Sequence, residues 1–129
     1  MDAIFINLSN HDSSKWSVKQ IEEALKLSEN GPIIDIPFPN IDPELTSDEI
    51  TKLSCKYFNQ IINLIKEYEV DNAFIHVMGE MTFTFNIVNL FMNNGYICYA
   101  STTKRNVIEK EDGTKISTFD FVQFRQYSI

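Results

Sequence analysis

The chain has few of the residues on which metal centres and disulfide frameworks depend. Its 129 residues include only two cysteines, Cys55 and Cys98, and two histidines, His11 and His76. The cysteines fall in an expected helix and an expected strand with no CxxC pairing, so we expect two reduced core thiols. With no ligand cluster at metal spacing, we expect no zinc site, no other metal and no cofactor.

Glycine is also scarce, with four residues in the chain. No G-x-G-x-x-G motif follows the first apolar run and no P-loop follows any run, which argues against NAD-linked redox chemistry and NTP hydrolysis. Every apolar run is shorter than the roughly 18 residues of a membrane span. The N-terminal "MDAIFINLS" has Asp where a signal peptide has Lys or Arg. We therefore expect a soluble, cytoplasmic protein without a membrane partner.

Positive charge is in deficit. The chain has 11 Lys and Arg against 18 Asp and Glu, a net charge of −7. Long DNA or RNA needs many phosphate contacts from Lys and Arg, so long nucleic acid is not an expected partner. A small anionic ligand needs only a local cluster of positive charge and backbone amides, so this ligand class stays open.

Apolar residues are plentiful at 43%, and they include ten Phe and five Tyr. This length and composition suit one domain, which we expect to span residues 1–129. Apolar runs between polar loops predict strands at Ala3–Ser9, Ile33–Pro37, Asn72–Met78 and Tyr96–Thr102. Helical spacing and capping residues predict helices at Val18–Ser28, from Thr46 to about Tyr68, and at Thr82–Asn93.

The ends of two helices carry capping patterns. Ser17 with Gln20, and Thr46 with Glu49, have the spacing of capping boxes. Strands that alternate with helices predict a parallel sheet covered on both faces.

The C-terminal quarter predicts a β-hairpin. Arg105–Lys110 and Lys115–Phe124 flank Asp112-Gly113, which favours a tight hairpin turn. Apolar residues on both faces of the second stretch indicate a strand covered on both sides, or a dimer contact. The expected fold is thus α/β, three-layer and Rossmann-like, with a mainly parallel sheet and a C-terminal β-hairpin.

In such a sheet, ligands bind beyond the carboxyl ends of the strands. Three loops should meet there, at residues 9–16, 79–82 and 101–105, and Pro37–Asn40 would border the same mouth. Two of their side chains have alternative roles. His11 either bonds its own loop or acts in catalysis, and Trp16 either packs as a hydrophobic staple or stacks on a base. His76 lies within a buried strand, where a satisfied core histidine is the favoured interpretation.

The turn at Gly79-Glu80-Met81-Thr82 is the most suggestive of the three. A carboxylate at a helix N-terminus is favoured by the helix dipole whether or not it has a function. Gly79 would let the backbone approach a ligand closely, and Thr82 brings a hydroxyl to the first helical turn. The amide groups there would face an anion.

These residues suggest a family. The segment "IHVMGEMTFTFNIVNLFMNNGYICYAST" resembles the strand–Gly–Thr–helix–strand segment of CRISPR-associated Rossmann-fold (CARF) domains. The length, the element order and the C-terminal hairpin look similar over the whole chain. The family often has Gly-Gly-Thr-Lys at the turn, and the lysine is absent here. Lys15, or Lys104 and Arg105, would then have to supply the phosphate contact.

The resemblance implies a small CARF-like protein of type III CRISPR systems, a ring nuclease that forms a homodimer. It would bind a cyclic oligoadenylate, with cyclic tetra-adenylate the expected ligand, and cleave it without metal by attack of a ribose 2′-hydroxyl. His11 would be the acid and Glu80 the base, and Lys104 and Arg105 would stabilise charge. The expected ligand-binding residues are Ser9, Asn10, Ser14, Lys15, Trp16, Gly79, Met81, Thr82 and Thr102.

Three alternatives remain, and whether the protein is an enzyme stays open. The first is a non-catalytic sensor or sponge that binds the same signal. The second is a nucleoside-processing N-glycosidase or deoxyribosyltransferase-like enzyme, in which Glu80 would attack the anomeric carbon. The third is an interaction module with a vestigial cleft, which the acidic surface and the aromatic-rich final strand equally suit.

Overall fold

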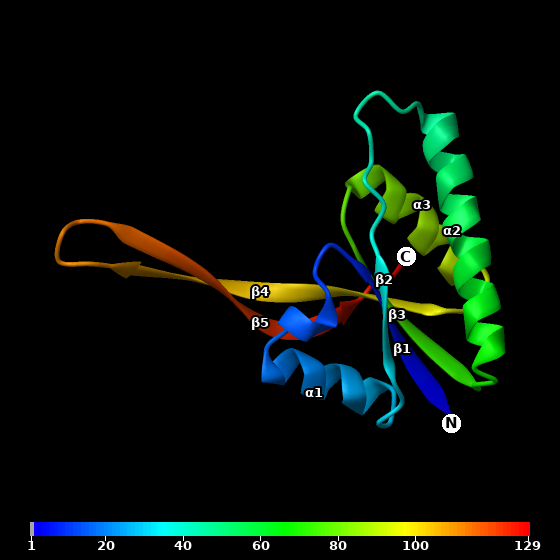
Figure 1. The fold of residues 1–129 in the computed structure, drawn as a ribbon, viewed down its shortest axis with the longest axis horizontal. Helices are drawn as coiled ribbons and strands as arrows, with labels where there is room; N and C mark the ends of the chain where they lie inside the picture. The colour runs from blue at the N-terminus through cyan, green and yellow to red at the C-terminus, as the bar shows by residue number, and fades with distance from the viewer. Residues whose placement is uncertain (1) are drawn as a thin grey trace.

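The computed structural model describes residues 2–129. Its elements are β1 (Ala3–Ser9), η1 (Ser13–Lys15), α1 (Val18–Leu27), β2 (Ile33–Pro37), α2 (Ser47–Glu67), β3 (Asn72–Met78), α3 (Met81–Asn93), β4 (Ile97–Glu109) and β5 (Lys115–Gln126) (Figure 1). The five strands form one sheet in the order β2-β1-β3-β4-β5. All neighbours are parallel except β4 and β5. The predicted three-layer, Rossmann-like fold with a C-terminal hairpin is confirmed.

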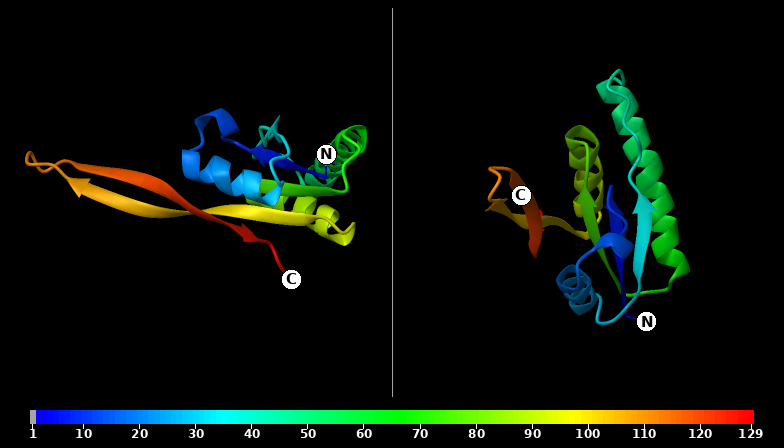
Figure 2. Two further views of the ribbon diagram at one scale, coloured as in Figure 1. Left: turned by 90° about the horizontal axis from the view of Figure 1, so that it is seen from below. Right: turned by 60° about the vertical axis from the view of Figure 1, so that its left-hand side comes forward.

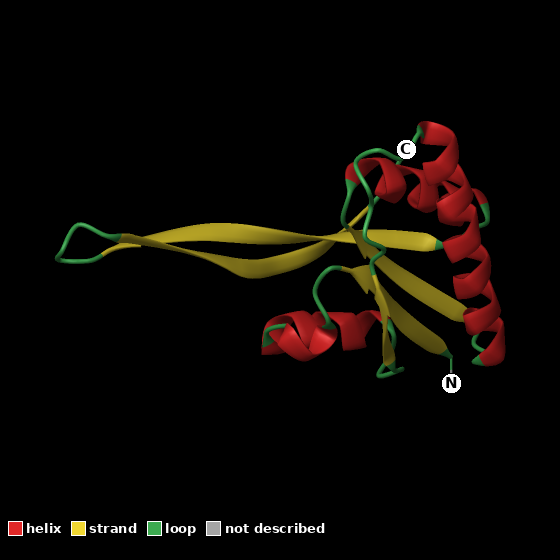
Figure 3. Cartoon of the chain, turned by 45° about the horizontal axis from the view of Figure 1, so that its top comes forward, coloured by secondary structure: helices red, strands yellow, loops and turns green. Residues whose placement is uncertain are grey.

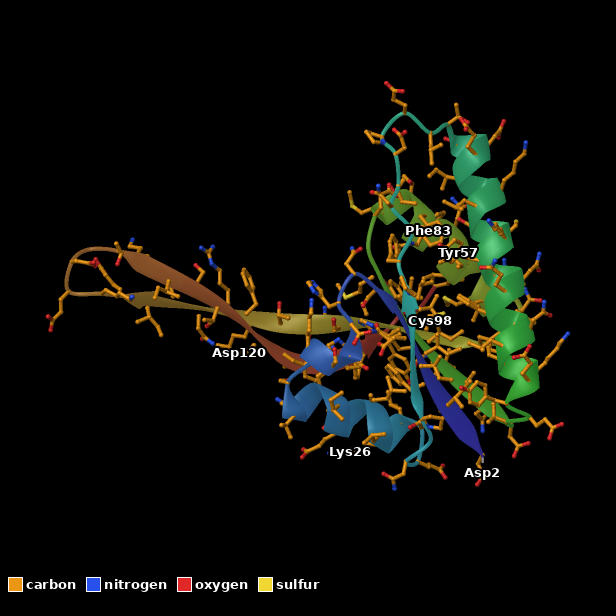
Figure 4. All side chains as sticks on the ribbon, viewed as in Figure 1. Asp2, Lys26, Tyr57, Phe83, Cys98 and Asp120 are labelled. Atoms are coloured by element: carbon orange, nitrogen blue, oxygen red, sulfur yellow. The ribbon has the colours of Figure 1, made fainter. Side chains whose placement is uncertain are left out.

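The two faces of the sheet are covered unequally. Helices α2 and α3 pack on one face, and α1 lies on the other (Figure 2). The main core lies beneath α2 and α3, where Ile6, Ile75 and Cys98 meet Ile61 and Phe83. Figure 4 labels Cys98 and Phe83 in this core. Helix α1 has ten residues and α2 has 21. The face on the α1 side is therefore covered by a shorter helix.

Local hydrogen bonds explain where the helices begin. The Thr46 hydroxyl accepts from the Glu49 amide while the Glu49 carboxylate accepts from the Thr46 amide, which completes the predicted capping box of α2. The Ser17 hydroxyl accepts from the Gln20 amide at 3.2 Å and caps α1. Within residues 2–129, a reciprocal capping box is formed only in α2.

The hairpin differs from the prediction. We expected separate strands at Tyr96–Thr102 and Arg105–Lys110, but β4 is one strand from Ile97 to Glu109. It pairs with β5 from Tyr99 to Glu109, with a register shift at Thr102/Thr103. The hairpin projects far beyond the rest of the molecule (Figure 3). We call its projecting part, residues 104–120, the arm. Polar side chains suit a strand there because water reaches both of its faces.

The cysteine prediction was half wrong. Cys98 is a buried free thiol, and burial raises its pKa to about 12. Cys55 is also free, but it is exposed on α2. The helical period places Cys55 beside the buried Ser54 and outside the apolar stripe. Within residues 2–129, no helix combines the length and the apolar character that crossing a membrane requires.

Candidate functional site

A cleft of about 1110 Å³ opens on the α1 side of the sheet, at the carboxyl ends of the parallel strands. Its floor comes from β1, β3 and β4, and its walls come from the loop before α1, the start of α1 and the base of the hairpin. The lining residues are Ser9, Asn10, His11, Lys15, Trp16, Ser17, Lys19, Gln20, His76, Met78, Gly79, Ser101, Thr103, Phe119, Asp120 and Phe121. Lys15 and Lys19 give it positive charge within an acidic chain.

Polar side chains cross the sheet beneath this cleft. The strand register sets Asp35 of β2 beside Asn7 of β1, and Asn7 beside His76 of β3. Ser101 of β4 lies on the same face, two residues beyond the partner of His76. The atoms are in contact: Asn7 Nδ2 donates to Asp35 Oδ1 at 2.8 Å, and His76 Nδ1 lies 2.9 Å from Asn7 Oδ1. His76 Nε2 lies 3.2 Å from Ser101 Oγ. We call Asp35, Asn7, His76 and Ser101 the polar row.

The polar row also holds the loop after β1 in place. Asn7 Nδ2 donates to the His11 carbonyl at 2.8 Å, and Ser9 Oγ donates to Asn7 Oδ1 at 2.7 Å. Asp35 accepts from the amide and the hydroxyl of Ser13. The loop that carries His11 into the lining is thus fastened to the sheet by buried amide and hydroxyl groups.

His76 is the buried titratable group of this site. It is 2% exposed, and its ring is packed edge-on against Trp16 and Phe124 at centroid distances of 5.5 and 5.4 Å. Burial lowers its pKa from the ordinary 6.5 to about 4. The ring is therefore neutral at neutral pH, with one nitrogen protonated and one free to accept.

Six of the site residues expected from the sequence line the cleft. They are Ser9, Asn10, His11, Lys15, Trp16 and Gly79. Trp16 packs on Phe5 and also lines the cleft, so stacking on a base stays a prediction. Pro37 and Phe38 line an adjoining cavity of about 190 Å³ that shares Ser9 and Asn10 with the cleft, so the start of the loop after β2 lies beside the main mouth.

The other expected residues lie outside this lining: Ser14, Glu80, Met81, Thr82, Thr102, Lys104 and Arg105. The amide of Ser14 bonds Asp12, and Thr102 bonds the Gln123 carbonyl of the neighbouring strand. Lys104 and Arg105 belong to the exposed arm, where Arg105 contacts Ser117. We expected His11, Glu80 and the Lys104-Arg105 pair to share one pocket. In the single chain they do not, because only His11 lines the cleft.

Glu80 serves the helix that follows it. Its carboxylate accepts from the Phe83 amide at 2.9 Å and from the Thr82 hydroxyl at 2.7 Å, so it caps α3. The Thr82 hydroxyl, and then the Phe83 amide, lower the pKa of this carboxyl. The Phe83 amide, one of those that we expected to face an anion, already donates to Glu80 and is not free for a ligand.

Gly79 has a packing role as well as a place in the lining. A Cβ atom there would lie 2.3 Å from the ring of Phe38. That ring packs edge-on against Phe83 at 5.1 Å. The close approach that we expected from a ligand is thus made by an aromatic side chain.

Part of the lining was missed: Ser17, Lys19, Gln20, Met78, Phe119, Asp120 and Phe121. Ser101 and Thr103 belong to the stretch 101–105 that we expected at this rim. His76 is the buried and hydrogen-bonded strand histidine that we expected, and it also lines the cleft. Polar residues at alternate strand positions, such as Asn7 and Ser9 or His76, are a signal of such a cleft, because they are unusual beneath a fully covered sheet face. Residues 2–129 hold no group of three or more His, Cys, Asp or Glu side chains placed to share a metal ion.

A family profile matches residues 3–125, nearly the whole chain and all of the elements that form the cleft. The chain belongs to the uncharacterized protein MJ1673 family. Comparison with curated proteins and with solved structures gave no match. Membership of the MJ1673 family therefore assigns no activity to the chain, and the cleft is the feature that bears on its function.

Proposed function

We propose that this protein binds a cyclic oligoadenylate in the cleft and cleaves one of its phosphodiester bonds, as a CARF-like ring nuclease that ends type III CRISPR signalling in the cytoplasm. Cyclic tetra-adenylate is the candidate ligand. The observation that carries the proposal is the lining of the cleft, which holds Lys15 and Lys19 against one carboxylate, Asp120, together with hydroxyl groups and aromatic rings.

Each part of such a ligand finds suitable chemistry in the lining. Phosphates suit Lys15 and Lys19, because charge-assisted hydrogen bonds are the strong ones. Ribose hydroxyls suit Ser101 and Thr103, and adenine rings suit aromatic faces such as Phe119. A net charge of −7 works against long nucleic acid, while a small ligand meets only the local charge.

Binding without cleavage is the second candidate. Three of the four residues expected to be catalytic, Glu80, Lys104 and Arg105, lie outside the lining, which favours a sensor or sponge. The same position of Glu80 gives no support to a nucleoside N-glycosidase, whose nucleophile would have to face the ligand. Release of free adenine would favour that enzyme class.

The proposal includes a homodimer. The arm exposes large apolar side chains outside the lining of the cleft: Ile108 is 58% exposed, Val107 52% and Ile116 41%. A two-stranded hairpin is marginally stable on its own, and apolar side chains in water do not stabilise it. A second copy would cover the arm and would bring its Lys104 and Arg105 towards a shared ligand.

The test is titration of cyclic tetra-adenylate by calorimetry, followed by chromatography of the products. We expect binding by the wild type, weakened at least about tenfold by the double substitution Lys15→Gln and Lys19→Gln. The matched control is Lys52→Gln with Lys66→Gln, which removes the same charge from exposed positions on α2. Absence of binding by the wild type, or equal losses in both double variants, would refute the proposal.

A further inference from the structure

The polar row fixes the proton positions of its members. Asn7 Nδ2 contacts the His11 carbonyl and Asp35 Oδ1, each at 2.8 Å, and both of these oxygens are acceptors. The Asn7 side chain therefore cannot be flipped, and its Oδ1 faces His76 Nδ1 at 2.9 Å. Because Oδ1 only accepts, Nδ1 carries the ring proton. The free lone pair of His76 is then on Nε2.

That lone pair points at a hydroxyl of the cleft. Ser101 Oγ lies 3.2 Å from His76 Nε2, and Ser101 is half-buried in the lining. Ser101 Oγ is also 3.0 Å from Met78 Sδ, but a thioether is a weak acceptor and imidazole nitrogen is the stronger one. A hydroxyl, a base within hydrogen-bond reach and a third group that orients the base are the parts of an activated nucleophile.

We propose that Ser101 is a nucleophile, with His76 as its general base and Asn7 as the residue that orients His76. Its substrate class, a phosphodiester, rests on the proposed function, whereas the activation of Ser101 rests on the contacts of the polar row alone. Asn7 orients His76 because its amide oxygen accepts the hydrogen bond from Nδ1. The Trp16 ring, packed edge-on against the imidazole, limits its rotation.

The reaction balances without a metal or a second reagent other than water. Ser101 Oγ bonds to phosphorus while its proton passes to His76 Nε2. The bond from phosphorus to the 5′-oxygen breaks, and that oxygen takes the proton from Nε2. Water then gives a proton to Nε2 and attacks phosphorus, and Ser101 leaves and regains its proton. The product is a linear 3′-phosphate, whereas attack by the ribose 2′-hydroxyl would yield a 2′,3′-cyclic phosphate.

Diisopropyl fluorophosphate tests the nucleophile without any knowledge of the natural ligand. We expect one diisopropylphosphoryl group on Ser101 of the intact protein, identified by peptide mass spectrometry, and none on Ser101→Ala. Thr118→Val is the matched control, since it removes a hydroxyl from an exposed position of the same hairpin outside the lining, and it should keep the wild-type labelling rate. His76→Gln should label at least about 100-fold more slowly. No adduct, an adduct elsewhere, or wild-type labelling of His76→Gln would overturn the proposal.

A pH profile of the wild type serves if His76→Gln does not fold. The groups that face His76 or line the cleft around it are Asp35, Tyr99, His11, Lys15, Lys19 and Asp120. With His76 as base, the labelling rate should be level from about pH 6 to 8 and fall below about pH 5, because burial holds the pKa of His76 near 4. A rate that rises tenfold per pH unit would mean solvent hydroxide is the base, and would overturn the proposal.

The two proposals fail in different ways. If Ser101 is labelled but cyclic tetra-adenylate is neither bound nor cleaved, the proposed function fails and the nucleophile stands. If the ligand is cleaved to a 2′,3′-cyclic phosphate and Ser101 is not labelled, the proposed function stands and the nucleophile fails.

Discussion

Acidification should destabilise this protein through His76, by an amount that the structure sets. His76 titrates near pH 4 in the folded protein and near 6.5 when unfolded. The unfolded chain therefore takes up the proton first, and stability present above pH 6.5 is lost as the pH falls towards 4. By linkage, folding stability should drop by roughly 2 kcal/mol between pH 8 and pH 5 on this account alone, and by about 3 kcal/mol in total below pH 4.

The perturbation that isolates this effect is His76→Gln. Carboxylates also titrate below pH 5, but they are the same in both proteins and cancel in the comparison. Urea unfolding at pH 8 and pH 5, followed by fluorescence of the single tryptophan, gives the free energy of unfolding at each pH. The loss between these pH values should be roughly 2 kcal/mol larger for the wild type than for the variant.

His11→Gln is the control for this measurement. It removes the other histidine of the chain, whose side chain is exposed in the loop after β1. This variant should keep the pH dependence of the wild type. If His76→Gln instead lost as much stability on acidification as the wild type, burial of a neutral imidazole would not be the cause.

Three further outcomes follow from particular contacts. Gly79→Ala should destabilise the protein by about 1–3 kcal/mol in urea unfolding, since the new methyl group would overlap the Phe38 ring, and Phe38→Leu in the same chain should recover part of this loss. Thr84→Val should stabilise the protein by about 1 kcal/mol, because the buried Thr84 hydroxyl has no hydrogen-bond partner within residues 2–129. Thr82→Val is the contrasting variant and should destabilise the protein, because it loses the hydrogen bond to Glu80. Ile108→Asp should convert a dimer into a species of 14.9 kDa in light scattering; a wild type already of that mass would contradict the proposed dimer.

The fold could be predicted because its strands and helices have strong and distinct periodicities. Ala3–Ser9 and Asn72–Met78 begin and end at the predicted residues. The prediction failed at β4, where Thr103, Lys104 and Arg105 looked like a loop. A strand is recognised in a sequence by the apolar residues of its buried face. The strands of the arm are exposed on both faces and therefore lack this signal.

The loop after β1 and the stretch 101–105 were predicted to belong to the site, whereas the contact between Ser101 and His76 was not predicted. The loop after β1 was found because topology alone brings it to the carboxyl edge. His76 was taken for a core residue because its burial is visible from its apolar neighbours, while its partner Ser101 lies 25 residues away in sequence. The cleft exists because α1 covers only part of its face of the sheet. The extent of that cover is set by the folded structure, so the sequence does not show which polar strand residues lie beneath a cleft.

Glu80 shows the opposite error. A Gly-Glu pair at a strand-to-helix turn has the same residue types whether the carboxylate faces a ligand or its own helix. The neighbouring Thr82 and the Phe83 amide decide the matter by satisfying the carboxylate locally. The sequence is compatible with a Glu80 that faces a ligand and with a Glu80 that caps α3, and only the distances in the folded chain distinguish the two.

The continuity of β4 places the cleft and the arm on one strand. Thr103 and Glu109 belong to one ladder with β5, and Ser101 stands on the same strand beyond the register shift at Thr102/Thr103. Paired ribbons of two strands twist more strongly than wider sheets. A molecule that bound the far end of the hairpin would therefore hold the strand whose other end lines the cleft, and a change of twist in the ribbon would reach the mouth through the irregular pair at Thr102/Thr103.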